Sequence, residues 1–342
     1  MLMRAVMIAL VAVLLSACSN PREEVTEQLA HQVLLPAHQQ WHDSNAALLV
    51  ATQGYCADEL DGPALKQGFY RVLQSWSYLQ PLMVGPMAEG NRSWQVQFWP
   101  DKRNMVARQV EALLDASSPL SQEALEGASV VVQGLSAFEY VLFDEAVDLD
   151  TRSDRYCPLL TGIARHQQAL SKAVLELWEG PQGMAAMLVD FPNQRYASAD
   201  EALSLILRTQ ITAVDVLKKK LGTPMGRLNK GVPQPWQAEA WRSQHSIGNL
   251  QASLAGARAV WEQVRSLVGD AQLVSRIDSG YENTAQKLAG LPAPLVELVQ
   301  NKENLPRLQS LYDSLDNLEN LQQVELAKDL GIQLGFNAND GD

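Results

Sequence analysis

Histidine is scarce in this chain, which has 342 residues and only five histidines: His31, His38, His42, His166 and His245. None of them is followed by glutamate, so the His-Glu-x-x-His helix that binds zinc in many metalloproteases is absent. Basic residues are also few, with 27 Lys and Arg against 39 Asp and Glu, which gives a net charge of −12. An acidic chain without a long basic run lacks the electrostatic pattern of a nucleic-acid-binding protein.

Strict alternation of apolar and polar residues, the pattern of a half-buried strand, is missing as well. Apolar residues recur instead at helical spacing, as at Val131, Leu135, Phe138 and Leu142. The run 202–221 follows a capping box, Ser198-Ala-Asp-Glu, and is followed by Gly222 and Pro224. Helical patterns continue over 236–268 and 274–291 and resume through residue 330. The sequence therefore predicts an all-α protein.

The N-terminus has the shape of a secretory signal, with Arg4 followed by an apolar run over residues 5–15 that is short for a membrane span. Leu-Ser-Ala-Cys18 then resembles a bacterial lipobox, which implies cleavage before Cys18 and lipid attachment to it. Several acyl chains on one residue give stable membrane anchoring. Ser19, rather than Asp, after the cysteine favours sorting to the outer membrane, and residues 19–25 are interpreted as a polar tether. The alternative is an ordinary signal peptide over 1–18 with a chance cysteine.

Two further cysteines, Cys56 and Cys157, would be exported with the chain. Because an oxidising compartment favours disulfide formation, we expect these two residues to be paired. The alternative is two buried free thiols.

A domain boundary is predicted within residues 180–198, where glycine and proline gather before the capped helix begins. The division gives an N-terminal half, 26–185, and a C-terminal half, 186–342. Each half has room for about four long helices, the number that makes a bundle. A duplicated four-helix bundle would account for two such halves, although no internal repeat is evident in the sequence.

Four segments, in this order along the chain, resemble motifs of the imelysin family of bacterial cell-envelope proteins. They are Phe98-Trp-Pro-Asp-Lys-Arg-Asn104, Gly134-Leu-Ser-Ala-Phe-Glu139, Trp241-Arg-Ser243 and the C-terminal Gly335-Phe-Asn-Ala-Asn-Asp-Gly-Asp342. The cysteine pair also falls where members of the family often have one. The resemblance implies an all-helical fold of two bundle-like halves, with a functional site where they meet. It further implies export, a link to iron uptake and, for some members, a metallopeptidase activity.

The second of these segments departs from the family at one position. The family motif is Gly-x-His-x-x-Glu, and Ser136 stands here in place of the histidine. A catalytic zinc site usually needs three protein ligands and an open position for water, and a neutral hydroxyl is a poor ligand. Glu139 alone would leave such a site incomplete, so peptidase activity is not expected.

Glu139 has two other interpretations. A carboxylate on the inner side of an apolar helix must be paired, so it would accept hydrogen bonds or meet an arginine such as Arg242 or Arg103. Otherwise it takes part in ligand or metal binding. The site residues that the resemblance suggests are Gly134, Ser136, Glu139, Trp99, Asp101, Arg103, Trp241, Arg242 and Ser243.

A second, separate metal candidate is the pair His38 and His42, which share a helix face at spacing i, i+4. Trp99 and Trp241 are expected to fill the core, with a stacking wall for haem as the alternative.

Together these features predict an outer-membrane lipoprotein, anchored through Cys18 and facing the periplasm or the cell exterior. Its expected role is non-enzymatic binding or assistance in iron or haem acquisition, beside an outer-membrane receptor. The alternatives are a divalent-metal-dependent peptidase of the imelysin type and a structural envelope protein.

Overall fold

The computed structural model describes residues 20–116 and 120–332, and within these ranges the chain forms helices and turns without any strand. The all-α prediction is therefore confirmed. No helix in the described ranges is long and apolar enough to cross a membrane. The predicted signal peptide, the lipidation site at Cys18 and the motif 335–342 lie outside the described residues.

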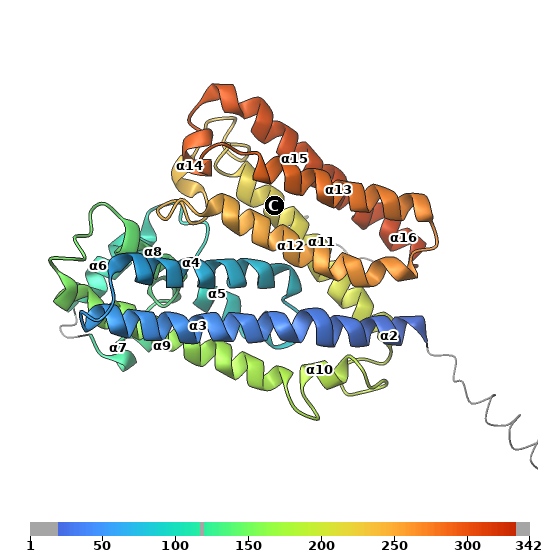
Figure 1. Ribbon diagram of the computed structural model, residues 1–342, viewed down its shortest axis with the longest axis horizontal. Coiled ribbons are helices and arrows are strands. Elements are labelled where there is room, and N and C mark those ends of the chain that lie inside the picture. The colour runs from blue at the N-terminus through green and yellow to red at the C-terminus, as the bar shows by residue number, and fades with distance from the viewer. Residues whose placement is uncertain (1–19, 117–119, 333–342) are drawn as a thin grey trace, which may run out of the picture.

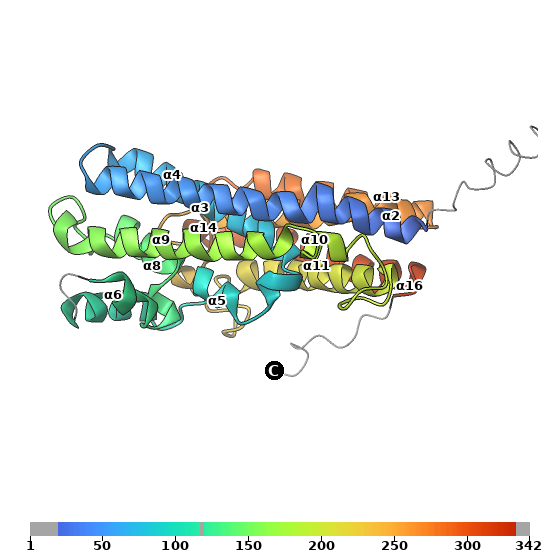
Figure 2. The same ribbon diagram turned by 90° about the horizontal axis from the view of Figure 1, so that it is seen from below.

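The N-terminal part is built on long helices that run side by side along the longest axis of the molecule (Figures 1 and 2). Helix α3 packs against both α4 and α9. Short helices complete this part, with α5 and α6 at one side of α9 in Figure 2. The bounds are α2 (Pro21–Gln28), α3 (Leu35–Cys56), α4 (Gly62–Leu79), α5 (Arg92–Val96), α6 (Met105–Ala116), α7 (Gln122–Glu126), α8 (Leu135–Phe143), α9 (Ser153–Trp178) and α10 (Met184–Met187).

Helix α2 begins inside the stretch 19–25 for which the sequence suggested a tether. Asn20 caps the helix by accepting a hydrogen bond from the Arg22 backbone N–H, and Pro21 occupies the first turn. Val25 is already buried in the core. Any tether is thus shorter than predicted, because the apolar face of the first helix packs against the rest of the protein.

The C-terminal part stacks α13 and α15 on α11 and α12, as Figure 1 shows in yellow to red. Ser198 accepts a hydrogen bond from the Glu201 backbone N–H, so the predicted cap does begin α11. The bounds are α11 (Ala199–Gly222), α12 (Ser246–Val264), α13 (Ala271–Ala289), α14 (Leu295–Leu298), α15 (Leu305–Asn320) and α16 (Ala327–Asp329).

The two parts share one hydrophobic core. Helix α12 packs directly on α4, and one cluster of buried apolar side chains extends from Val25 to Ile332. A division into domains near residue 185, and an origin by duplication, therefore remain predictions.

A disulfide joins Cys56, at the end of α3, to Cys157, near the start of α9. The expected pairing is confirmed. It links two helices that also pack along their length.

Two predicted helices begin later than their apolar patterns suggested. The pattern over 236–268 yields a 3-10 turn at Pro235–Gln237 and an α-helix only from Ser246, because Ala240 and Gln244 adopt positive φ angles of 50° and 58° that interrupt a helix. The pattern from Val131 yields a 3-10 turn and then α8 from Leu135. Both corrections place the family-like segments at helix ends and in loops.

Candidate functional site

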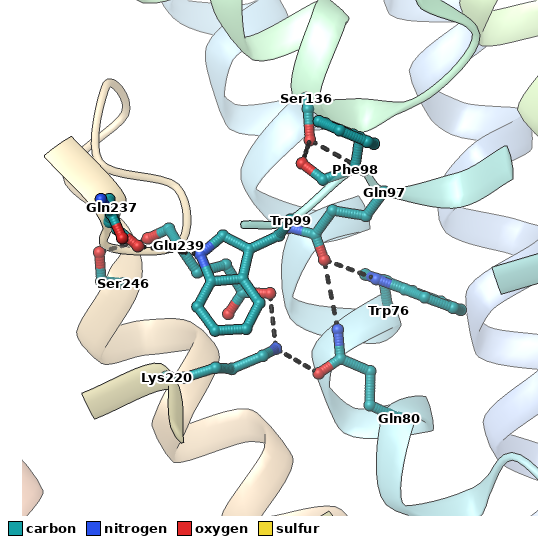
Figure 3. Close-up of polar contacts among 10 residues, drawn as sticks. All are labelled: Trp76, Gln80, Gln97, Phe98, Trp99, Ser136, Lys220, Gln237, Glu239 and Ser246. Atoms are coloured by element: carbon teal, nitrogen blue, oxygen red, sulfur yellow. Dashed lines mark hydrogen bonds and ion pairs between the residues drawn. The ribbon is translucent and has the colours of Figure 1, made fainter. Parts of the chain in front are cut away.

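The N-terminus of α8 lies directly against the chain segment 96–98. A Cβ atom on Gly134 would be 2.4 Å from the Val96 carbonyl oxygen, so a larger residue would push the two backbones apart. Two residues on, the Ser136 hydroxyl donates to the Phe98 carbonyl at 2.9 Å and accepts from the Phe98 N–H at 3.2 Å (Figure 3). At the position where the family motif has histidine, Ser136 therefore binds the backbone of Phe98 through two hydrogen bonds.

We expect Ser136→Ala to lower the free energy of unfolding by about 1–2 kcal/mol, because both hydrogen bonds to Phe98 are lost at a half-buried position. Urea denaturation followed by circular dichroism measures the change. Ser204→Ala is the matched control, since the Ser204 hydroxyl donates within its own helix, to Asp200. Equal stability of the two variants would show that the Ser136 bonds contribute nothing.

Glu139 lies on the same helix, buried, and points to the loop that precedes α12. Its Oε1 accepts hydrogen bonds from the Ser243 backbone N–H and the Ser243 hydroxyl, each at 2.8 Å. Burial raises the pKa of Glu139, and the Ser243 hydrogen bonds and the positive charge of Arg242 oppose that shift in part. The Glu139 carboxylate therefore accepts hydrogen bonds, as the first of its two interpretations predicted, and links α8 to the loop 238–245. The donor is Ser243 and not an arginine.

Arg242 joins three segments at the same place. Its Nε atom lies 2.6 Å from Asp144 Oδ2, and its Nη2 atom donates to Asn104 Oδ1 at 2.7 Å. The guanidinium group also lies 4.3 Å from the centroid of the Trp241 ring, a cation–π arrangement. The arginine is therefore tied to Asp144 rather than to Glu139.

The remaining residues of the first family-like segment have distinct positions. Asp101 accepts hydrogen bonds from the backbone N–H groups of Met105 and Val106 and so caps α6. Trp99 donates through Nε1 to the Gln237 carbonyl at 3.0 Å. The structure therefore brings the segments 98–104, 134–139 and 241–243 together, although they are far apart in sequence.

Two of these segments, 98–104 and 241–243, border a cavity of about 870 Å³, whereas no residue of 134–139 lines it. We call it the joint cavity; its lining residues fall within 101–104, 143–145, 233–237, 241–244 and 296–300. Trp236 and Trp241 meet edge to face with ring centroids 4.9 Å apart, and Trp236 is 58% exposed. Lys102, Arg103 and Arg242 place basic groups on the lining, and Asp101, Asp144, Glu145 and Glu297 place acidic ones. This is the cavity where Asp101, Arg103, Trp241 and Arg242 of the predicted site gather.

A second cavity, of about 700 Å³, has no described lining residue in common with the joint cavity. We call it the tryptophan cavity, because Trp76, Trp94 and Trp99 line it. Lys220 and Glu239 also line it, as a buried ion pair with Nζ and Oε1 2.6 Å apart (Figure 3). The sequence gives no sign of this pair. Lys220 ends a run of three lysines and Glu239 lies in a polar loop, so no local pattern identifies either residue.

The two histidines of the second metal candidate point to different neighbours. His38 is fully buried, with Nδ1 2.8 Å from the Leu34 carbonyl oxygen and its ring centroid 4.4 Å from that of Trp178. His42 Nδ1 lies 3.4 Å from the Ser171 hydroxyl. Among the residues that the structure describes, no group of three or more His, Cys, Asp and Glu side chains could hold a metal ion.

Burial of His38 also makes stability depend on pH. Burial lowers its pKa from 6.5 to about 4, so the unfolded chain takes up a proton first as the pH falls. The contribution of His38 to the free energy of unfolding is fully present above pH 6.5 and is lost as the pH falls from 6.5 to about 4. At pH 5 the loss is about 2 kcal/mol.

Urea denaturation at pH 7.5 and pH 5 should therefore show a loss that is about 2 kcal/mol smaller in His38→Phe, which cannot titrate. The exposed His31, changed to Asn, is the control and should keep the wild-type slope. An unchanged pH dependence in His38→Phe would contradict this assignment.

Fold and site together define a class: an all-helical protein whose N-terminal and C-terminal parts both line a ligand-sized cavity. The sequence model of the imelysin family matches residues 34–322, and the chain belongs to that family. A comparison with curated protein sequences gives no match.

Two solved structures share the fold. An imelysin-like protein from Psychrobacter arcticum has a TM-score of 0.78 at 19% identity, covering 92% of this chain and 97% of that one. A protein from Parabacteroides distasonis, named as an iron-regulated protein A precursor, has a TM-score of 0.73 at 14% identity, with the same coverage of both chains. At these identities the likeness concerns the fold.

Proposed function

We propose that this protein is an imelysin-type lipoprotein of the outer membrane that binds an iron compound, haem in the first place, without catalysing a reaction. The observation that carries the proposal is the joint cavity, because the family-like segments 101–104 and 241–243 border it. The name of the Parabacteroides neighbour, an iron-regulated protein, supports the link to iron.

The lining of the joint cavity suits a flat, anionic ligand. Trp236, which is 58% exposed, offers an aromatic face of the kind that stacks on a porphyrin. Lys102 and Arg103 are exposed basic residues that could meet carboxylate groups of the ligand. Asp101 and Asp144 also line the cavity, but Asp101 accepts backbone hydrogen bonds at the start of α6 and Asp144 is paired with Arg242. The anionic groups are therefore expected near Lys102 and Arg103, away from Glu145 and Glu297.

A non-enzymatic role is supported by what the motif residues already do. Ser136 is engaged with the Phe98 backbone, and Glu139 Oε1 accepts two hydrogen bonds from Ser243. A peptidase would need Glu139 or another carboxylate free to serve a metal or a water molecule. The contacts of Glu139 favour a structural task instead.

Titration calorimetry tests the ligand. The chain from Ser19 onward, which contains every described residue, would be titrated with haemin, ferric citrate and zinc chloride. Haemin is expected to bind once per chain, and Arg103→Glu combined with Trp236→Ala should weaken it at least tenfold. Arg71→Glu, an exposed charge reversal on α4, is the control and should bind like the wild type.

Each alternative predicts a different result. Binding of none of the three probes would refute the iron proposal. Cleavage of denatured casein that is lost in Glu139→Gln would establish the peptidase, and absence of both binding and cleavage would leave the structural envelope protein.

The membrane anchor needs its own experiment. In cells that express the full chain, Cys18→Ala should move the protein from the membrane fraction to the soluble fraction. Partnership with an outer-membrane receptor would then be sought by cross-linking of the anchored protein under iron starvation. Persistent membrane association of Cys18→Ala would contradict lipid attachment at that residue.

A further inference from the structure

The walls of the tryptophan cavity have the composition of a small-molecule site. Three indole rings and the thioethers of Met83 and Met87 line a volume of about 700 Å³, within the range of known ligand pockets. Trp76 is buried, whereas Trp94 is 48% exposed. An aromatic guest would cover the exposed face of Trp94 and stack among the other rings.

Among the polar residues that line this cavity is a buried carboxylate, Glu239, with one oxygen that has no hydrogen-bond partner in the described part of the chain. Glu239 is 2% exposed as a side chain, and its Oε1 meets Lys220 Nζ at 2.6 Å. Its Oε2 is shielded from solvent and accepts no hydrogen bond from any described residue. A buried acceptor without a donor costs stability, so a ligand that supplied the donor would recover that loss.

The neighbouring side chains determine which Glu239 oxygen the described residues leave without a hydrogen-bond partner (Figure 3). Lys220 Nζ also donates to Gln80 Oε1 at 2.5 Å, and Gln80 Nε2 donates to Gln97 Oε1 at 3.3 Å. Gln97 Oε1 in turn accepts from Trp76 Nε1 at 2.9 Å. This chain of bonds holds Lys220 on Glu239 Oε1 and leaves Oε2 as the preorganised acceptor.

We propose that the tryptophan cavity is a second binding site, which accepts an aromatic small molecule bearing a hydroxyl or amino group, with Glu239 Oε2 as the acceptor of its proton-bearing group. The proposal goes beyond the iron-binding function and does not depend on it, because the joint cavity has different lining residues. A negative substituent at the polar side would be repelled by the Glu239 carboxylate.

Matched probes of one size test the chemistry. The chain from Ser19 onward would be examined by equilibrium dialysis with 2-naphthol, 2-methylnaphthalene, which lacks the donor, and 2-naphthoate, which is anionic. We expect 2-naphthol to bind once per chain and at least tenfold more tightly than either of the others. Because Arg208 also lines the cavity, tighter binding of 2-naphthoate would overturn the proposal, as would equal binding of 2-methylnaphthalene.

Glu239→Gln can replace the acceptor at the position of Glu239 Oε2 with a hydrogen-bond donor. Its amide oxygen can still face Lys220, so its NH2 group would replace Oε2 and offer a donor. The affinity for 2-naphthol should fall at least tenfold, and that for 2-acetylnaphthalene, which only accepts, should rise. An unchanged order of affinities would refute the role of Glu239.

Ala213→Phe locates the site without touching the polar network, because Ala213 lines the cavity from α11. The larger ring should abolish 2-naphthol binding and leave haemin binding as in the wild type, which separates this proposal from the iron function. Ala47→Phe, at an exposed position of α3, is the control. If Ala213→Phe does not fold, Trp94→Ala at the exposed wall should weaken 2-naphthol at least fivefold. Unchanged binding in the folded variant would place the ligand elsewhere and refute the assignment.

Discussion

Replacing Lys220 with methionine is expected to lower the free energy of unfolding by about 3–5 kcal/mol, because it leaves the Glu239 carboxylate buried without a counter-charge. The side chains of Lys220 and Glu239 are 5% and 2% exposed, so water cannot take over the role of the lysine. Gln80 would lose a hydrogen bond as well, since its Oε1 accepts from Lys220. Urea denaturation at pH 7.5 measures the loss.

The double variant Lys220→Met, Glu239→Gln distinguishes two causes of the loss in the free energy of unfolding: a buried carboxylate without a counter-charge, and the lost packing of the lysine side chain. Removing both charges should recover more than half of the loss, because a neutral buried pair needs no counter-charge. Lys219→Met is the control, since Lys219 is 42% exposed and its ion pair with Asp215 should contribute less than about 1 kcal/mol. If Lys220→Met were as stable as Lys219→Met, or if the double variant were as unstable as Lys220→Met, the unpaired Glu239 carboxylate would not be the cause of the loss.

Removing the disulfide should have an effect of similar size. Cys56 and Cys157 are 101 positions apart, and in the chain-entropy model a cross-link over a loop of about 100 residues stabilises the folded state by about 4–5 kcal/mol. The variant Cys56→Ser, Cys157→Ser should therefore unfold at much lower urea concentration under oxidising conditions, at neutral pH.

Dithiothreitol provides the control for this variant. The reductant should shift the wild-type transition to that of the serine variant and leave the variant itself unchanged. A wild-type transition that does not move under conditions where free-thiol assays show two thiols would mean that the cross-link contributes nothing. The packing of α3 on α9 would then hold these helices without it.

Several features of the fold followed from short stretches of sequence. The cap of α11 at Ser198 depends on a side chain and a backbone N–H only three residues away, and such local bonds follow directly from residue order. The pairing of Cys56 with Cys157 followed from cysteine number and an exported context, and the structure confirms it. The apolar spacing along α8 likewise indicated a helix, although not the residue at which it begins.

The candidate site could be predicted only as a set of residues. The family-like motifs identified Glu139, Arg242 and Ser243, but not that Ser243 donates to Glu139 while Arg242 turns to Asp144. The same motifs gave no indication of Lys220 and Glu239. Partners from remote segments are selected by packing and by the need to satisfy buried polar groups, and neither has a signature in the local sequence.

The sequence by itself determined the helical class, the cysteine pair and the family, because helical periodicity, capping and motif order are properties of residues near one another along the chain. The tertiary structure alone decided that the pattern from residue 236 becomes a loop up to Ser246, where Ala240 and Gln244 adopt positive φ. It also decided that Ser136, which stands where the family motif has histidine, forms hydrogen bonds with the backbone. Ser136 reaches both polar atoms of the Phe98 backbone, and only the packing of α8 on residues 96–98 brings them within hydrogen-bonding distance.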